Sequence, residues 1–213
     1  MPRRARPARK RRAAETTAAA ARVFAERGYH GATTQDIADV LGIRQASLYY
    51  YFRSKEAALE EVCLDGVGAY VARAAAIMRG PGSAADKLAQ LVRHHIAPWR
   101  DRADFTRVFL RERHNLPDAS RHRVGRYARR YERIFQQVLE AGVAAGEFRR
   151  DLDCRIATLG AIGMCNAASA WYGVEPGATL ERIAGVFAAL LLEGVRTPMM
   201  RRTSARSGAR RRG

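Results

Sequence analysis

A run of hydrogen-bonding side chains at residues 45–51, Gln-Ala-Ser-Leu-Tyr-Tyr-Tyr, carries the most specific chemistry in the sequence. A glutamine amide can bond an adenine edge at two points, a serine hydroxyl can bond either kind of base edge, and an alanine methyl can contact a thymine methyl. Tyrosine hydroxyls more often reach phosphate oxygens, which fix position without reading sequence. The run therefore predicts contacts in the major groove of double-stranded DNA from Gln45, Ala46, Ser47, Tyr49, Tyr50 and Tyr51.

Polar residues on both sides of this run suit the DNA backbone. Thr33 and Thr34 open a predicted helix, where backbone amides and hydroxyls favour a phosphate group. Lys55 opens the helix after the run and is a predicted phosphate contact, and Arg44, just before the run, is a further predicted DNA contact. An aromatic core is the alternative for the aromatic residues, and it is the better interpretation for Phe52. Successive helical positions point about 100° apart, so at least one of the three tyrosines must face solvent or a partner.

The elements that would position these residues are two short helices joined at a glycine. Thr33 can cap the first helix, and Asp36 can return the hydrogen bond to it. Apolar residues follow at helical spacing until Gly42, where a chain that leaves a helix often adopts a left-handed conformation. A second helix is predicted over residues 45–52, with Leu48 facing inward. This pattern is a helix-turn-helix, whose second helix enters the major groove.

Residues 20–59 resemble, without a gap, the DNA-binding domain of TetR-type transcriptional repressors. The resemblance is carried by Gly28, Thr33-Thr34, Ile37-Ala38, Gly42-Ile43, Leu48-Tyr49, Tyr51-Phe52 and Ser54-Lys55-Glu56. The resemblance implies that nine residues occupy DNA-contacting positions: Thr33, Thr34, Gln45, Ala46, Ser47, Tyr49, Tyr50, Tyr51 and Lys55. Arg44 is predicted from the residues alone. The first helix of the family usually carries a large aliphatic residue where this chain has Thr16-Thr17. We therefore expect the first turns of this helix to be loosely held.

The whole chain is predicted to be all-α, with an N-terminal three-helix helix-turn-helix domain and a C-terminal helical bundle. Glycine and proline fall between helical runs, and no alternating strand pattern is sustained. The helices expected after the helix-turn-helix span residues 54–78, 84–99, 102–115, 119–145, 152–172 and 180–196. Their predicted N-caps include Ser83, Asp118, Asp151 and Thr179. The predicted domains are a basic disordered tail (1–12), a DNA-binding domain (13–58), a ligand-binding and dimerisation domain (59–200) and a second basic disordered tail (201–213).

Positive charge is concentrated at the two ends of the chain. The formal net charge is +17, yet residues 2–12 hold seven Arg or Lys, residues 201–213 hold six Arg, and neither segment has an acid. Such tails would attract phosphates at low salt, and solvated termini without function are the alternative. Three cysteines without paired spacing favour a reducing compartment. No apolar run reaches the ~18 residues of a membrane span, so a soluble cytoplasmic protein without a membrane partner is predicted.

The C-terminal half resembles one TetR branch, whose members respond to acyl-coenzyme A thioesters and govern fatty-acid or sterol catabolism. The match over residues 105–195 is carried by Arg111-Glu112, Leu116-Pro117, Tyr131, Gly142, Gly146-Glu147-Phe148, Asp151-Leu152-Asp153, Gly163-Met164, Asn166 and Trp171-Tyr172. The chain departs from the branch at Ala167, where an aromatic residue is usual, and at residues 173–177, where an Arg-Pro-Gly-Gly turn is usual. The resemblance implies a small-molecule effector of the acyl-coenzyme A type, with no metal and no other cofactor.

The residues predicted to bind this effector are Phe105, Phe109, Arg111, Tyr127, Tyr131, Met164, Asn166 and Trp171. Nine arginines lie between residues 107 and 133, and forked guanidiniums suit the phosphates of coenzyme A. A solvated helix face explains these arginines equally well. For the aromatic residues an ordinary core is the alternative, and for Asn166 it is a buried, hydrogen-bonded amide.

The last two predicted helices carry the features of a dimer interface. Gly160, Gly163, Ala167 and Ala170 would permit a close approach of helices, and the last helix repeats apolar residues with a period of 3.6. Two such helices from each of two chains would form an isologous four-helix interface. A core within one chain is the alternative. A dimer would place two reading helices on a palindromic site, which gives specificity that one short helix lacks.

The predicted function is a homodimeric repressor that a small ligand releases from its palindromic operator, with activation as the alternative outcome. A non-specific architectural nucleic-acid-binding protein, carried by the arginine tails, is the second class. An enzyme is not predicted, because the sequence contains no phosphate-binding glycine loop and no nucleophile elbow. His94 and His95 are adjacent and would point apart on a helix, so no metal site is predicted.

Overall fold

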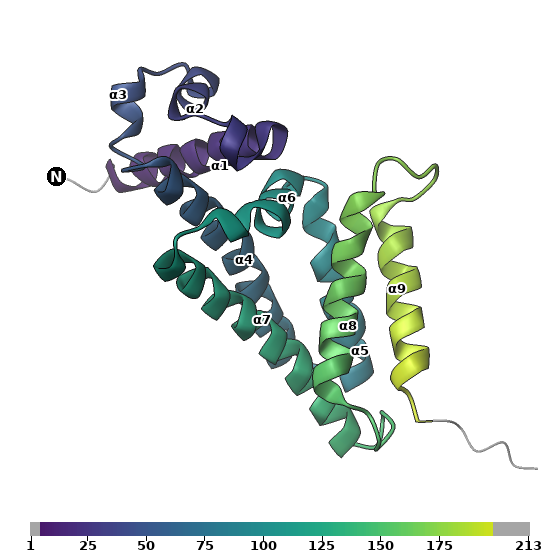
Figure 1. Cartoon of the computed structure of the whole chain (residues 1–213). Helices are drawn as coiled ribbons and strands as arrows, with labels where there is room; N and C mark the ends of the chain where they lie inside the picture. The colour runs from purple at the N-terminus through teal and green to yellow at the C-terminus, as the bar shows by residue number, and fades with distance from the viewer. Residues whose placement is uncertain (1–4, 198–213) are drawn as a thin grey trace, which may run out of the picture.

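The structure, a computed structural model, describes residues 5–197 as α-helices joined by turns (Figure 1). The helices are α1 Ala5–Gly31, α2 Thr34–Leu41, α3 Gln45–Leu48, α4 Lys55–Arg79, α5 Ala84–Ile96, α6 Ala103–Glu112, α7 Asp118–Ala144, α8 Cys154–Ala167 and α9 Leu180–Val195. Turns of 3-10 helix over Ala97–Trp99, Arg113–Asn115 and Ala168–Ala170 extend α5, α6 and α8. The predicted all-α fold is confirmed. The six helices predicted after residue 53 agree within two residues once these turns are included.

The first helix is longer than the sequence predicted. Residues 5–12, expected in a disordered tail, form the first turns of α1. Thr16 is fully buried, and its hydroxyl donates to the Arg12 carbonyl oxygen at 2.8 Å, while the Thr17 hydroxyl donates to that of Ala13 at 3.1 Å. A hydroxyl satisfied inside its own helix can enter a core, so α1 is packed from Thr16 onward. Residues 9–15 are exposed, and the loose hold of the first turns stays a prediction. The predicted tail at residues 201–213 lies outside the described residues.

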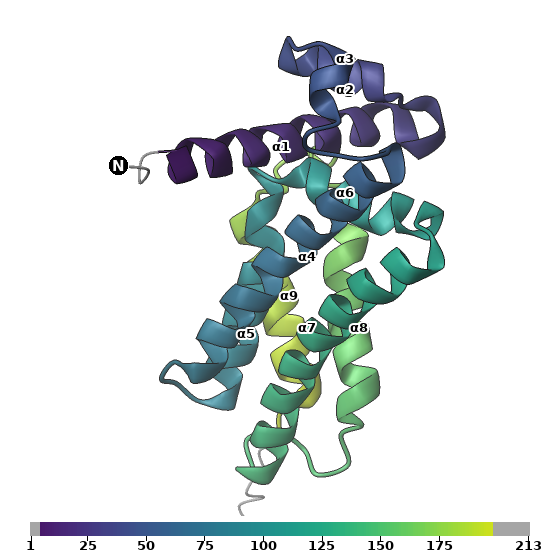
Figure 2. The ribbon, with the colours of Figure 1, turned by 90° about the vertical axis from the view of Figure 1, so that its left-hand side faces the viewer.

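The head of the molecule consists of α1, α2, α3 and the first turns of α4. Figure 2 shows α1 lying across the upper ends of α4 and α6. The core of the head is formed by residues that are less than 5% exposed, among them Phe24, Ile37, Leu48, Phe52 and Leu59. Val108 of α6 belongs to the same cluster. Because α4 continues from the head into the bundle, the predicted boundary between residues 58 and 59 falls inside one helix.

The bundle consists of α4 to α9, with α7 packed along α4 and α5 packed on α9. The turn between α7 and α8 lies at the lower end of the bundle. There the Glu147 carboxylate accepts hydrogen bonds from the Ala84 and Ala85 amides at 3.1 and 3.0 Å, which caps α5. Phe148 is fully buried against Gly142, where an added Cβ would stand 2.1 Å from the ring. No helix within residues 5–197 is long and apolar enough to cross a membrane.

Two of the four N-caps that were predicted for the later helices are present in the structure. Ser83 and Thr179 cap α5 and α9 as predicted. The other two cap predictions, Asp118 and Asp151, were wrong. Pro117 occupies the cap position of α7, and Asp153 caps α8 by accepting a hydrogen bond from the Ile156 amide. Several acceptors within one turn compete for a helix start, and the path of the preceding loop decides between them.

Candidate DNA-binding surface and ligand cavity

Local hydrogen bonds fix both ends of α2. The Thr33 hydroxyl accepts from the Asp36 amide at 3.1 Å, and the Asp36 carboxylate accepts from the Thr33 amide at 2.8 Å. The Thr33 hydroxyl also donates to the Asp36 carboxylate at 2.8 Å, and this bond, followed by that from the Thr33 amide, holds the pKa of Asp36 below its usual value. Gly42 ends the helix with φ at 62°, in the left-handed region that favours glycine. The predicted cap, capping box and turn glycine are therefore all present.

The second helix of the motif is shorter than predicted, because α3 ends at Leu48 and the chain continues as a turn. The Tyr51 and Phe52 amides both donate to the Leu48 carbonyl oxygen, at 2.8 and 3.0 Å. Tyr50 is 92% exposed, Tyr49 is 51% exposed and Tyr51 is 37% exposed, whereas Phe52 is buried. The predictions that a tyrosine must face solvent and that Phe52 belongs to the core are confirmed.

The remaining predicted base contacts lie next to one another on α2 and α3. Gln45 is held by α2, because its Nε2 donates to the Thr34 hydroxyl at 2.7 Å. Arg44 and Ala46 are exposed and Ser47 is half-buried. These elements form the upper end of the molecule in Figures 1 and 2. The short polar side chains of α2 and α3 are therefore accessible to a partner.

The Lys55 side chain, predicted to contact a phosphate, makes its contacts within the protein. Its ammonium donates to the Tyr29 and Ala32 carbonyl oxygens at 2.9 and 3.0 Å and lies 4.4 Å from the centre of the Tyr29 ring. A cation suits this place, because carbonyl oxygens at the end of a helix lack partners within the helix. Lys55 therefore joins α4 to the end of α1. Its partners are backbone atoms distant in sequence, so no sequence signal marked them.

Tyr29 is the point at which the head meets the bundle. Its backbone amide, just after the left-handed Gly28, donates to the Glu112 carboxylate at the end of α6, at 3.1 Å. Its hydroxyl donates to the Glu56 carboxylate of α4 at 2.6 Å. Burial, and then the bond to Glu56, raises the pKa of Tyr29 to about 12. The bundle helix α6 and the first turn of α4 thus both bind Tyr29.

A cavity of about 240 Å³ lies between α4, α5, α6, α7 and α8. Its wall is formed by Gly66, Val67, Tyr70, His95, Phe105, Thr106, Phe109, Leu110, Arg113, Ala128, Tyr131, Glu132, Leu159, Ile162, Gly163 and Asn166. A mainly apolar wall with a few polar groups is typical of small-molecule sites. Among residues 5–197, no group of three or more His, Cys, Asp or Glu side chains is arranged to hold a metal ion.

The polar groups of the cavity are organised by His95, which the sequence prediction missed. Its Nδ1 lies 3.1 Å from the Tyr131 hydroxyl, and its Nε2 lies 3.0 Å from the Asn166 side-chain oxygen. Burial lowers the pKa of His95 to about 4, so the ring is neutral near pH 7. A neutral ring has one donor and one acceptor. The assigned geometry therefore has Nε2–H donating to Asn166 and the Tyr131 hydroxyl donating to Nδ1. The only sequence signal was a histidine at a position on an apolar helix face.

The structure places half of the predicted effector contacts at the cavity. Phe105, Phe109, Tyr131 and Asn166 line it, whereas Arg111, Tyr127, Met164 and Trp171 do not. Arg111 is exposed because it lies two residues beyond Phe109, on the opposite side of α6. Tyr127 is 43% exposed. The Trp171 ring packs against Phe187 of α9 in the core, with ring centres 6.3 Å apart.

Four of the nine arginines between residues 107 and 133 form an ion pair or line the cavity. Arg107, Arg121 and Arg123 pair with Asp104, Asp118 and Glu60. Arg113 lines the cavity, and its guanidinium lies 4.9 Å from the centre of the Phe109 ring. The interpretation as a solvated, ion-paired face is thus the better one for the paired arginines, and Arg113 replaces Arg111 as the cation at the cavity.

Comparison with known families agrees with this arrangement. Residues 17–62, which contain the helix-turn-helix, match the model of the bacterial regulatory proteins of the tetR family. Residues 81–195, which contain most of the bundle, match the tetracyclin repressor-like C-terminal domain. The chain belongs to the TetR family. As a TetR-family protein it is a DNA-binding transcriptional regulator, and the resemblance identified from residues 20–59 is confirmed.

Individual relatives extend over most of the chain. This TetR-family protein is 30% identical over 179 residues to the transcriptional repressor KstR2 of Mycolicibacterium smegmatis, covering 83% of this chain and 86% of the relative. It is 30% identical over 142 residues to the fatty acid metabolism regulator protein of Bacillus subtilis, covering 65% and 72%. The structure of FadR from Bacillus subtilis in complex with stearoyl-CoA has a TM-score of 0.73 at 24% identity, over 85% of this chain and 98% of that one.

Proposed function

We propose that this TetR-family regulator is a dimeric repressor that an acyl-coenzyme A thioester releases from a palindromic operator. One observation carries the proposal: α6 forms a wall of the cavity through Phe105 and Phe109, and its last residue, Glu112, holds the Tyr29 amide in the head. A ligand that moves α6 would therefore act directly on the element that carries α2 and α3. The ligand works through its different affinities for the two arrangements.

The reading residues of the proposal are those of α3 and the turn after it. Gln45, Ala46 and Ser47 would face base edges, and Tyr49, Tyr50 and Tyr51 would contact phosphates. The exposure of the three tyrosines and the hydrogen bond from Gln45 to Thr34 support this assignment. Thr33, Thr34 and Arg44 remain proposed DNA contacts. Lys55 is proposed only as a positioning residue, because two carbonyl oxygens already bind its ammonium.

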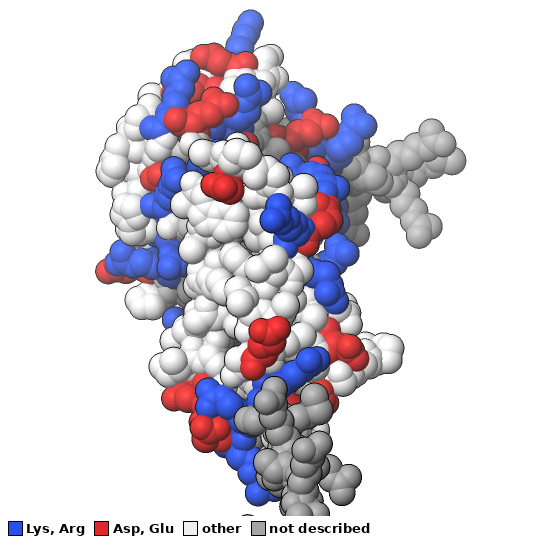
Figure 3. Space-filling view, turned by 90° about the vertical axis from the view of Figure 1, so that its right-hand side faces the viewer, with Lys and Arg blue, Asp and Glu red and all other residues white. Residues whose placement is uncertain are grey.

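The proposed dimer forms through α8 and α9. Figure 3 shows a broad uncharged surface on this side of the molecule. Ile156 of α8 is 63% exposed and Leu190 of α9 is 54% exposed. The small residues predicted to permit close helix contact, Gly160, Gly163, Ala167 and Ala170, are exposed rather than covered by their own chain. Exposed apolar residues beside exposed small residues favour a partner helix over a core within one chain.

The proposed effector is an acyl-coenzyme A because of the cavity and the relatives together. The cavity is apolar along Phe105, Phe109, Leu110 and Ile162 and polar at the His95 group. Its volume lies below the ~300–1,000 Å³ usual for ligand pockets, so it would take an acyl chain while the larger part of the ligand lies outside. The Bacillus subtilis relatives, one a fatty acid metabolism regulator and one a FadR structure with stearoyl-CoA, point to the same ligand class.

We infer a regulatory rather than a catalytic role for the described residues. Burial raises the pKa of the Cys63 and Cys165 thiols to about 12, so neither is an available nucleophile. His95, the one histidine that lines the cavity, is neutral and occupied by two hydrogen bonds. Since operator DNA lies in the cytoplasm of a bacterium, we propose that compartment as the site of action.

Selection of bound sequences from random duplex DNA at physiological salt tests the reading function. The full chain should enrich a palindrome with two half-sites. A Gln45→Ala variant should lose discrimination at one base pair per half-site, worth about 1–3 kcal/mol, whereas Gln136→Ala, on α7 and far from the head, should select the wild-type site. Binding without sequence preference, lost when residues 201–213 are removed, would favour the architectural alternative. Equal loss on every sequence for Gln45→Ala would remove Gln45 from the groove.

A further inference from the structure

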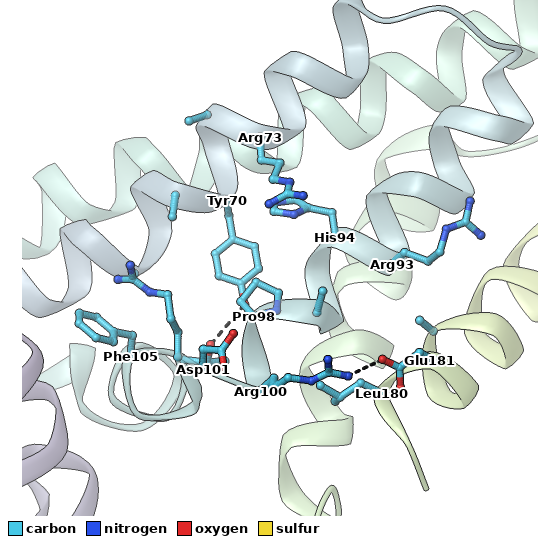
Figure 4. A pocket seen from close by; sticks show the side chains of 17 residues that line it. Tyr70, Arg73, Arg93, His94, Pro98, Arg100, Asp101, Phe105, Leu180 and Glu181 are labelled. Atoms are coloured by element: carbon cyan, nitrogen blue, oxygen red, sulfur yellow. Dashed lines mark hydrogen bonds and ion pairs between the residues drawn. The ribbon is translucent and has the colours of Figure 1, made fainter.

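A second hollow, of about 820 Å³, is lined in part by Tyr70 (Figure 4), which also lines the cavity. It is a groove formed by α4, α5, the start of α6 and α9. The groove and the cavity share four wall residues: Gly66, Tyr70, Phe105 and Thr106. At the shared wall the Tyr70 and Thr106 hydroxyls lie 3.2 Å apart in a hydrogen bond. The hydrogen-bonded Tyr70–Thr106 pair is therefore part of the wall between the small cavity and the large open groove.

The groove is rich in arginine, and half of its arginines carry no ion pair. Four arginines line it against two carboxylates, those of Asp101 and Glu181. Arg100 pairs with Glu181, and Arg102 pairs with Asp65 at 2.8 Å. Within residues 5–197, Arg73 and Arg93 have no carboxylate within ion-pair distance. Both side chains are exposed, so two guanidiniums are available to an anion.

His94 supplies a second, independent sign of a ligand in the groove. It lines the groove beside Arg73 (Figure 4), is only 9% exposed, and its Nε2 is buried without a hydrogen-bond partner in the described part of the chain. Buried polar atoms without partners are rare in folded proteins. Burial, and then the charge of Arg73, lowers the pKa of His94 to about 4, so the ring is neutral near pH 7. As the acceptor nitrogen of a neutral ring, Nε2 can accept a hydrogen bond from a ligand hydroxyl or amine.

We propose that this groove binds the phosphate end of a ligand whose apolar end occupies the neighbouring cavity, with Arg73 and Arg93 contacting the phosphates and His94 accepting a hydrogen bond from a ligand hydroxyl. The inference rests on the proposed function, because it assigns the charged end of the same effector. Coenzyme A ends in an adenosine that carries three phosphates, and guanidiniums bind phosphate through paired hydrogen bonds. The Tyr70 and Thr106 side chains must part, or the ligand must pass beside them, for one molecule to reach both sites.

Isothermal titration of the full chain with three probes tests the assignment: octanoyl-coenzyme A, adenosine 3′,5′-bisphosphate and octanoate. The variant is Arg73→Ala with Arg93→Ala, and the control is Arg130→Ala, an exposed arginine of α7 that does not line the groove. The double variant should bind octanoyl-coenzyme A at least about 10-fold more weakly than wild type, since each charged hydrogen bond is substantial. The control should bind as wild type does, and octanoate affinity should be the same in all three proteins.

The outcomes separate the groove from the proposed function. Equal octanoyl-coenzyme A binding by wild type and the double variant would overturn the groove assignment and leave the effector proposal standing. If octanoyl-coenzyme A does not bind but the bisphosphate binds and is lost in the double variant, the groove is a phosphate site for another phosphorylated ligand and the acyl-coenzyme A proposal fails. No binding of any probe would overturn both.

Discussion

Three half-buried or buried polar residues, Lys55, Glu112 and His95, join helices that are distant in sequence. Lys55 binds carbonyl oxygens at the end of α1, Glu112 binds the Tyr29 amide, and His95 links Tyr131 to Asn166. Each residue has a partner at least 23 positions away. A satisfied polar group in such a place holds one geometry and penalises others, since an orphaned partner loses its hydrogen bond without regaining water.

Lys55→Met should reduce stability more than DNA affinity. The change leaves the Tyr29 and Ala32 carbonyl oxygens without their donor, so the free energy of unfolding should fall by about 1–2 kcal/mol. Lys87→Met, which removes a half-buried lysine of α5 with no hydrogen bond in the described chain, is the matched control for urea unfolding. Unchanged stability together with a smaller salt dependence of DNA binding would show instead that Lys55 contacts a phosphate.

His95 should make stability depend on pH. Its pKa is lowered from 6.5 to about 4 by burial, so the unfolded chain takes up the proton first as pH falls. The contribution of neutral His95 to stability is therefore fully present above pH 6.5. As pH falls from 6.5 toward 4, the free energy of unfolding should fall by up to roughly 3 kcal/mol. In chemical unfolding between pH 7 and 4, His95→Gln should show a flatter profile than wild type, and the exposed-site control His122→Gln should not. Parallel profiles for all three proteins would contradict the burial of a neutral His95.

The residue-scale predictions succeeded where the chemistry is local. The Thr33 and Asp36 capping box involves residues three apart, and the exposed tyrosines follow from helix geometry alone. The carbonyl partners of Lys55 and the hydrogen bonds of His95 were not predicted, because they depend on which helix lies opposite. Periodicity places a residue on a face of its helix but does not identify the partner of that face.

At the scale of elements, the sequence located the helices well and their connections poorly. Helices after residue 53 were predicted within two residues because apolar periodicity and the Gly and Pro breaks are local signals. The second helix was predicted to reach residue 52, but α3 ends at Leu48. Residues 49–51 follow as a tight turn whose hydrogen bonds resemble those of a helix, so their side-chain pattern does not distinguish the two. The cavity could not be located at all from helix boundaries, because its volume depends on how five helices pack.

The contact between α6 and α1 should transmit ligand binding to the head. Glu112→Ala removes the acceptor of the Tyr29 amide, so octanoyl-coenzyme A should still bind the free protein but should weaken operator binding less than in wild type. The lost coupling should be a large part of the ~1–3 kcal/mol usual for such linkage. The measurement is operator affinity with and without ligand, with Glu140→Ala on α7 as the control. Equal coupling in wild type and Glu112→Ala would exclude this contact as the connection.

The whole molecule is proposed to act as a pair, because one head offers only a few base contacts. Ile156→Glu with Leu190→Glu places two carboxylates on the exposed face of α8 and α9, where dimerisation would bury them without partners. Sedimentation should show a dimer for wild type and a monomer for the double variant, with operator affinity greatly reduced. Tyr127→Glu, at a 43% exposed site on α7, should remain dimeric. A double variant that stays dimeric would place the interface elsewhere.

Fluorescence anisotropy of a labelled operator bound to the full chain measures whether an acyl-coenzyme A releases the DNA. Octanoyl- and stearoyl-coenzyme A are added, with coenzyme A alone and the cavity variant Asn166→Leu as controls. At least one thioester should release the DNA from wild type, coenzyme A alone should not, and Asn166→Leu should need a higher concentration. Operator that stays bound while titration shows the thioester saturating the protein would contradict release by an acyl-coenzyme A.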